Sequence, residues 1–505
     1  MELELNRTHI SGYDTVLDTT VFQEDTLETI VPDACPDILR LVNTQGKVLM
    51  KGKTALDGRV TLTGTARLTV LYQPDGGTGP CGLEVGIPFS ISVEEKSIHS
   101  GCTVVAVPRV VGADTRTLNP RKIMTRVEIA VHVKVFAAST AALCSGISAV
   151  DGTVEQLTQA HQLYCVSALQ EKQVSFEDNL NIPAGRTAAE ELLGSRVELI
   201  CSDSKIIGNK LIFKGEAAVQ LLYRSVGGGM DTADFSLPFS QITEVIGVGE
   251  DGACDLEMCL LAADFTLGAD GRTISVALTI LAQAVVHEVR SVVLLADAYS
   301  TCCKINAEQA PFEYFVCQTE GIGRQMVREI IEAGIQIKSV IDSYCAIGHM
   351  EQSRGADEIR LAAQAVVTAV CETEDGVCCA VSRSFDVSCG VEIPEGCVCR
   401  FVCRCENLIA TPTADGVEVR FVLDFPYSGL KRMSAPIVRD VSVSDATDEA
   451  QGCKPSIILR VLQDGEQLWN VAKRYGTTIA DIVKANKLES ERPDAGTLLL
   501  IPRKR

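Results

Sequence analysis

Residues 62–72 read LTGTARLTVLY, and 151 residues later residues 213–223 read FKGEAAVQLLY. In both stretches apolar residues alternate with small or polar ones, which is the period of a strand with one buried face. Two further matches keep nearly the same register: Val31-Pro32 with Ile182-Pro183, and the run IPFS at 87–90 with LPFS at 237–240. Three matches at an almost constant spacing indicate an internal repeat.

A third, weaker copy can be placed at 361–371, LAAQAVVTAVC, which resembles the others in pattern more than in identity. Each copy continues into a second strand-like run, at 127–135, 273–281 and 417–423. Asp-Gly pairs or glycine-rich turns separate the runs, and glycine adopts the positive φ that tight hairpins need. Each copy is therefore predicted to be an antiparallel β-sandwich or small barrel.

Before the C-terminal residues, helical signals lie mainly at the beginnings of the copies and in the connections between them. We expect short helices at 36–42, 187–193 and 323–332. The predicted fold is mainly β, with tandem antiparallel sandwich or barrel-like repeats followed by a small α+β (βααβ) domain. The predicted division is 1–150 for a first β module with an N-terminal extension, 151–320 for a second with a leading helical connection, 321–445 for a degenerate third, 446–456 for a linker and 457–505 for the small domain.

The composition suits several folded domains, since the chain has 505 residues, of which 46% are hydrophobic and 22% charged. A net charge of −20 argues against nucleic-acid binding, which needs a basic face. Residues 457–505 differ from the rest, with nine Lys or Arg against six Asp or Glu. A mildly basic unit on an acidic body could steer toward an acidic partner, or could be an ordinary solvated face.

The sequence also predicts where the chain resides. The segment after Met1 has neither a basic start nor an apolar run, so we expect no signal peptide. No stretch reaches the roughly 18–20 apolar residues of a spanning helix, so we expect no transmembrane segment and a cytoplasmic chain. Several of the 21 cysteines lie in strand-like apolar runs, where reduced thiols behave as small hydrophobes. A minority could cross-link in an oxidising assembly.

The cysteine-rich run CVCRFVCRC contains two Cys-x-Cys pairs, which could bind zinc through four thiolates: Cys397, Cys399, Cys403 and Cys405. In one extended strand the outer two would lie about 26 Å apart, at about 3.3 Å per residue, so a structural strand is favoured over a metal site. We find no Cys-x-x-Cys, paired histidines, nucleophile elbow, phosphate loop or dinucleotide fingerprint. We therefore expect no enzyme and no cofactor.

The last 49 residues have a pattern of their own. Residues 457–463 alternate as a strand, Asp464 and Gly465 form a turn, and Glu466 and Gln467 open a helix. The inward face of this helix is Leu468, Val471, Ala472 and Tyr475. Gly476 is expected to end the helix, Thr478 to cap a second helix that Asn486 ends, and residues 498–501 to return as a strand.

This pattern resembles the LysM domain. The Asp-Gly turn, Leu468-Trp469, Ala472, Tyr475-Gly476, Asn486 and the final Leu-Ile-Pro fall where that family has them. The resemblance implies binding of N-acetylglucosamine polymers such as peptidoglycan, in a groove between 464–468 and 486–489. Gln467 departs from the hydroxyl residue usual in the family. The candidate ligand- or partner-binding residues are Asp464, Gly465, Glu466, Gln467, Leu468, Trp469, Lys473, Asn486, Lys487 and Leu488.

The whole layout, repeated β modules followed by one terminal LysM-like unit, resembles the SipL family of clostridial spore coat morphogenetic proteins. The resemblance implies a mother-cell protein recruited to the forespore surface and spore coat. Its partners would be a coat ATPase of the stage IV sporulation protein A type and other coat proteins. We therefore expect a non-enzymatic coat-assembly adaptor. The alternatives are a peptidoglycan-binding anchor to cortex or cell wall, and a metal-binding β protein using the four cysteines.

Overall fold

A computed structural model describes residues 3–76, 79–149, 154–355, 358–444 and 457–502. Strands dominate it and the two helices are short, which confirms the predicted mainly-β class. The predicted linker at 446–456 lies outside the described residues. In the part of the chain that the structure describes, no helix is long and apolar enough to cross a bilayer.

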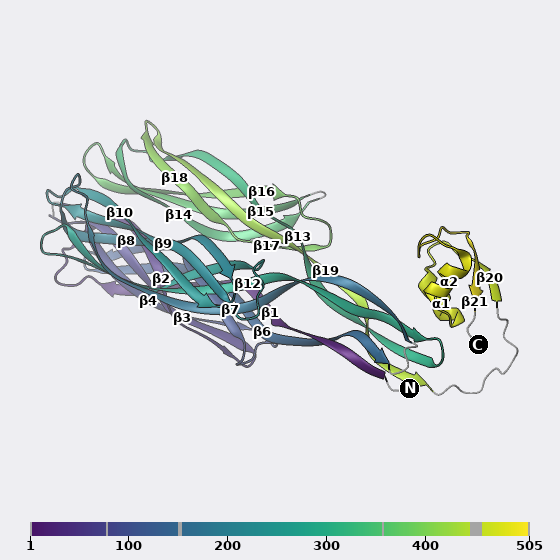
Figure 1. The fold of residues 1–505 in the computed structure, drawn as a ribbon. Helices are drawn as coiled ribbons and strands as arrows, with labels where there is room; N and C mark the ends of the chain where they lie inside the picture. Colours follow the sequence, from purple (N-terminus) through teal and green to yellow (C-terminus); the bar gives the residue numbers. More distant parts are fainter. Residues whose placement is uncertain (1–2, 77–78, 150–153, 356–357, 445–456, 503–505) are drawn as a thin grey trace.

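One six-strand unit accounts for each of the three β modules (Figure 1). The first contains β1 (Leu3–Ile30), β2 (Ile38–Leu56), β3 (Arg59–Pro74), β4 (Cys81–Glu94), β5 (Thr103–Asn119) and β6 (Lys122–Ala149). The second contains β7 (Val154–Asn181), β8 (Ala189–Ile207), β9 (Lys210–Ser225), β10 (Met230–Glu244), β11 (Ala253–Leu267) and β12 (Thr273–Ser300). The third contains β13 (Lys304–Glu332), β14 (Ile337–Arg354), β15 (Ile359–Thr373), β16 (Cys378–Val391), β17 (Cys397–Phe401), β18 (Arg404–Thr413) and β19 (Gly416–Ser444), so that its fifth strand is split in two.

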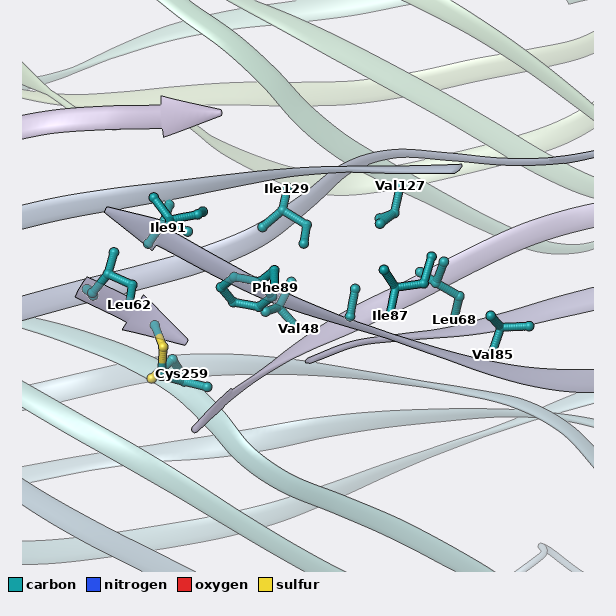
Figure 2. Packing of buried hydrophobic residues seen from close by; sticks show 14 of the residues in the cluster. Val48, Leu62, Leu68, Val85, Ile87, Phe89, Ile91, Val127, Ile129 and Cys259 are labelled. Atoms are coloured by element: carbon teal, nitrogen blue, oxygen red, sulfur yellow. The ribbon is translucent and has the colours of Figure 1, made fainter. Parts of the chain in front are cut away.

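Each module is a sandwich of two antiparallel sheets. In the first, β2, β3 and β4 form one sheet in chain order, while β6 lies between β1 and β5 in the other. Figure 2 shows side chains from the two sheets in one apolar core, among them Leu62, Phe89 and Ile129. The alternation in residues 62–72 places every second side chain in this core, so the predicted sandwich is confirmed.

Polar contacts join the modules to one another. Between the first and second, Lys53 contacts both Glu171 and Gln283. Between the second and third, Arg196 binds Asp342 at 2.9 Å, where the Asp342 side chain is only 2% exposed. Buried charges of this kind are tolerated when they are paired. The three sandwiches therefore pack against one another and are not independent domains joined by linkers.

The glycine of the repeat has a packing reason. Gly64 on β3 lies opposite Phe89 on β4, and a Cβ at Gly64 would stand 2.6 Å from the Phe89 ring and 2.6 Å from the Leu49 carbonyl oxygen. The second module repeats this pair with Gly215 and Phe239. The third replaces it with Ala363 opposite Val387. The weaker third copy thus exchanges a small-large pair for two side chains of intermediate size.

The first and last strands of each module continue past the sandwich as a two-stranded stalk. Stalk 1 pairs residues 3–14 with 137–149, stalk 2 pairs 154–165 with 288–300, and stalk 3 pairs 304–315 with 432–444. Figure 1 shows the stalks leaving the sandwiches toward the C-terminal unit. They share buried apolar side chains, including Leu143, Leu294 and Ile437. Three ribbons that could not bury a face alone therefore form one bundle.

Several sequence predictions are corrected here. The helices predicted at 36–42, 187–193 and 323–332 are wrong. The first two segments are strand after two residues without regular structure, and the last lies wholly within β13. Its residues pair one for one with β19, and this long-range pairing overrides helix propensity. The second module accordingly begins with a strand, not a helical connection, and the expected N-terminal extension is β1. The predicted boundary at 320/321 falls inside β13, which already belongs to the third module.

The C-terminal unit has the predicted order of elements: β20 (Ile457–Val461), α1 (Leu468–Tyr475), α2 (Ile479–Asn486) and β21 (Leu498–Pro502). The two strands pair antiparallel, with Val461 opposite Leu498. Gly476 ends α1 in the left-handed conformation at φ 63°, and the Thr478 hydroxyl accepts the Asp481 N–H at the start of α2. Glu466 and Gln467 were predicted to open the helix. Gln467 is instead the N-cap residue, and α1 begins at Leu468.

Substituting the repeat glycine tests the account of the core. We expect Gly64→Ala to lower the stability of the chain by about 1–3 kcal/mol, because the new methyl group overlaps Phe89 and the Leu49 carbonyl. Adding Phe89→Val should recover part of the loss, as the third module suggests. Gly86→Ala is the control, since its Cβ would meet only a methyl group at 3.5 Å. Urea denaturation measures all three, and equal midpoints for Gly64→Ala and Gly86→Ala would contradict the account.

Candidate functional site

The turn between β20 and α1 presents polar side chains to solvent. Asp464 and Gln467 are exposed, and Gly465 between them holds a positive φ of 74°. The Gln467 side chain makes no capping hydrogen bond. Glu466, by contrast, is half-buried, because one carboxylate oxygen binds Arg460 at 2.7 Å and the other accepts the Gln463 N–H at 3.3 Å. The Glu466 carboxylate therefore stabilises the turn through contacts within the domain and is not free to bind a ligand.

The loop after α2 has a similar division of roles. The Asn486 amide donates to the carbonyl oxygens of Ile482 and Leu500 at 2.8 and 2.7 Å and accepts the Leu500 N–H at 2.7 Å. Leu488 packs against the apolar core of the unit. Lys487 is exposed and caps the helix with a positive φ of 54°. Asn486 and Leu488 thus fix the loop, and Lys487 is the exposed one of these three predicted residues.

The two loops meet at one end of the β20–β21 sheet. The Leu462 N–H donates to the Thr497 carbonyl at 3.0 Å, and the Gly496 N–H donates to the Leu462 carbonyl at 2.9 Å. Leu468, also predicted as a binding residue, is 2% exposed and belongs to the core. Apart from Lys473, the exposed residues of the predicted site are here called the groove edge: Asp464, Gly465, Gln467 and Lys487.

Trp469 and Lys473 already have a partner within the chain. The Trp469 Nε1–H donates to Asp297 Oδ2 at 2.8 Å, and the Lys473 ammonium lies 2.6 and 2.7 Å from the two oxygens of the same carboxylate. The Tyr299 ring stands edge-on to Trp469 with centroids 4.9 Å apart, and its hydroxyl donates to the Thr477 carbonyl at 2.8 Å. We call Asp297 and Tyr299, on β12 in stalk 2, the stalk tip, and Trp469, Lys473 and Thr477 the α1 face.

Sequence reasoning missed the stalk tip. Asp297 and Tyr299 lie in an apolar strand run more than 150 residues before the C-terminal unit, and no local pattern links the two. Tyr299 is 4% exposed, and burial raises its pKa above the usual range, as do Glu155 and Asp297 nearby. A buried tyrosine needs a partner for its hydroxyl, which is the one signal that could have drawn attention to it.

The four cysteines at 397–405 lie along β19. Cys397 and Cys399 on β17 pair with Lys431 and Gly429, and Cys405 on β18 pairs with Leu423, so they are spread along the strand. Burial raises the pKa of Cys399 to about 11 and of Cys403 to about 12, which favours neutral thiols. Among the described residues, no three His, Cys, Asp or Glu side chains gather as a metal site would require. The metal-binding alternative therefore has no geometric support.

Comparison with protein families matches both parts of the chain. The family model described as "SipL, SPOCS domain" matches residues 188–267, which span β8 to β11 of the second module. The model of the LysM domain matches residues 461–502. The chain is SipL-like. Comparisons with curated proteins and with solved structures find no significant match. The two family matches indicate a sporulation protein with a peptidoglycan-binding type of module.

Asn486 tests the structural half of the LysM site. Asn486→Ala removes two hydrogen bonds that join α2 to Leu500 of β21 and one to the Ile482 carbonyl within α2, so we expect the LysM domain to lose about 2–3 kcal/mol of stability. Trp469 is the one tryptophan of the chain, so its fluorescence reports unfolding of this domain during urea denaturation. Asn470→Ala, at an exposed position of α1, is the control. If both variants unfold at the wild-type midpoint, Asn486 does not have this role.

Proposed function

We propose that this SipL-like chain is a non-enzymatic adaptor of spore coat assembly, whose LysM domain docks onto a basement-layer protein of the coat at the forespore surface. The proposed partner is a coat ATPase of the stage IV sporulation protein A type. The three β modules would provide separate surfaces for other coat proteins. The match to the SipL SPOCS domain, together with the LysM domain, is the main support.

The composition of the groove edge supports a protein partner. Gln467 stands where LysM domains usually have a hydroxyl residue, and its free amide offers both donors and an acceptor. Asp464 and Lys487 add one exposed charge of each sign. Opposite charges beside an amide suit the mixed polar surface of a protein, whereas a neutral glycan offers no ionic partner for either.

The charge distribution adds a second argument. Residues 457–505 carry a formal charge of +3, and the remainder of the chain carries −23. An acidic partner surface attracts the basic LysM domain and repels the acidic remainder of the chain. The molecule therefore approaches such a surface with the LysM domain first. Screening reduces this steering as salt rises, because the Debye length is about 8 Å at physiological ionic strength.

The alternative function is binding of peptidoglycan, which would anchor the protein to cortex or cell wall. The LysM match itself favours this alternative, because LysM domains commonly bind N-acetylglucosamine polymers. Sedimentation with purified peptidoglycan separates the two functions. Binding to peptidoglycan that soluble chitooligomers abolish would favour the glycan anchor.

Charge and amide substitutions at the groove edge test the proposal. In the full-length chain we expect Gln467→Ala combined with Lys487→Glu to weaken capture of the purified coat ATPase at least about tenfold, the equivalent of about 1.4 kcal/mol. Arg474→Ala, exposed on α1 outside the groove edge, should leave capture unchanged. No capture by the wild-type chain, together with chitooligomer-sensitive sedimentation, would replace the proposal with the alternative.

A further inference from the structure

We propose that the stalk tip is a built-in docking site for the LysM domain, and that the contact is autoinhibitory. It covers Trp469 and Thr477 of the α1 face, engages the ammonium of Lys473, and leaves the groove edge open. The inference goes beyond the proposed function, because it concerns access to the LysM domain whatever partner binds there. Three observations carry it: the shared carboxylate, the paired aromatic rings, and the restriction of both to one stalk.

Asp297 is the centre of the contact. Its Oδ2 accepts the Trp469 indole N–H and a Lys473 proton, while its Oδ1 accepts another Lys473 proton and the N–H of Ala298 at 2.9 Å. The Asp297 side chain is only 15% exposed, so the carboxylate has exchanged most of its water for these donors. Hydrogen bonds between ionised partners are shorter and stronger than neutral ones. Separating the surfaces would leave the carboxylate to be rehydrated.

The aromatic rings supply the apolar part. Trp469 is 6% and Tyr299 4% exposed, and Leu157 of β7 packs against the same cluster. The Tyr299 hydroxyl reaches the Thr477 carbonyl, so one tyrosine touches both the side chain and the backbone of the LysM domain. Edge-to-face pairs at this spacing add to the effect of buried area. Without the stalk tip, the outer surface of Trp469 would face solvent.

The contact is specific to stalk 2. Each stalk carries one unpaired bulge residue on its second strand: Ser145, Ala296 and Arg439. Counting from the bulge, the positions of Asp297 and Tyr299 are occupied by Gly146 and Ser148 in stalk 1 and by Asp440 and Ser442 in stalk 3. Only stalk 2 combines the carboxylate with an aromatic ring. The docking site is therefore an addition to the repeat and not a property of every copy.

The consequence is a difference in access between two surfaces of one domain. A partner that binds the α1 face must displace Asp297 and Tyr299, and can do so only by the amount that it favours the released state. A ligand at the groove edge meets no such competition, since Asp464, Gln467 and Lys487 are exposed with the stalk in place. The stalk tip thus selects which LysM surface is used first.

The single tryptophan makes the contact directly measurable. In the full-length chain, Asp297→Lys should shift the emission of Trp469 to longer wavelength and raise its quenching by acrylamide several-fold, because the indole becomes hydrated. Lys473→Glu should produce the same shift from the other side of the contact. The double variant Asp297→Lys with Lys473→Glu should return toward the wild-type spectrum, since the ion pair is restored with reversed sign.

Asp440→Lys is the matched control, because it makes the same charge change at the corresponding, exposed position of stalk 3. Its spectrum should equal that of the wild type. An unchanged spectrum in both Asp297→Lys and Lys473→Glu, or an equal shift in Asp440→Lys, would overturn the proposal. A wild-type spectrum that changes on dilution would also overturn it, since the LysM domain would then dock on a second copy. Far-UV circular dichroism confirms that the variants remain folded.

Discussion

The continuous antiparallel pairing of the first and last strands of each module is the interaction on which the rest of the structure depends. In the first module it runs from Leu3 opposite Ala149 to Ile30 opposite Lys122. One end of the ladder completes the second sheet of the sandwich, and the other forms the stalk. Without it the sandwich would lose a strand, and the backbone groups of 137–149 would lose their ladder partners, so that among them Ile147 would keep its bonds to the Gln156 side chain.

The stalks in turn position the LysM domain. Their shared core contains side chains from all three modules, such as Cys144, Leu295 and Val438, so that the bundle is built from segments far apart in the chain. At its end stalk 2 offers one carboxylate and one aromatic ring, and the α1 face packs there. The LysM domain therefore has one surface committed to its own chain and one surface, the groove edge, facing solvent.

Local patterns predicted what local interactions determine. The alternation in 62–72, 213–223 and 361–371 corresponds to β3, β9 and β15, because each is a strand with one face in a sandwich core. The caps at Gly476 and Thr478 were predictable since each acts within one turn. The stalks were not, because the partner of Lys304 is Ser444, and nothing near either residue encodes the other. The helix expected at 323–332 failed for this reason.

The candidate site divides in the same way. The sequence resemblance pointed to the loops at 464–468 and 486–489, yet Glu466 and Asn486 are occupied by contacts within the domain, and Trp469 and Lys473 by Asp297. A family motif contains residues that stabilise the fold as well as residues that bind a ligand. The contacts that each residue makes in the structure distinguish the two kinds. The distant residue Asp297 shows how far such a partner can lie in the sequence.

Amide hydrogen exchange along 137–149 and 288–300 tests the central claim, that these segments are paired strands of a packed bundle, most directly. For the alternate amides that bond within each two-stranded ladder, the account predicts protection comparable to that of the sandwich strands, because the ladder bonds them and the bundle shields them from water. Exchange within seconds in these segments, while β3 and β9 remain protected, would contradict it. The stalks would then not be the element that holds the LysM domain.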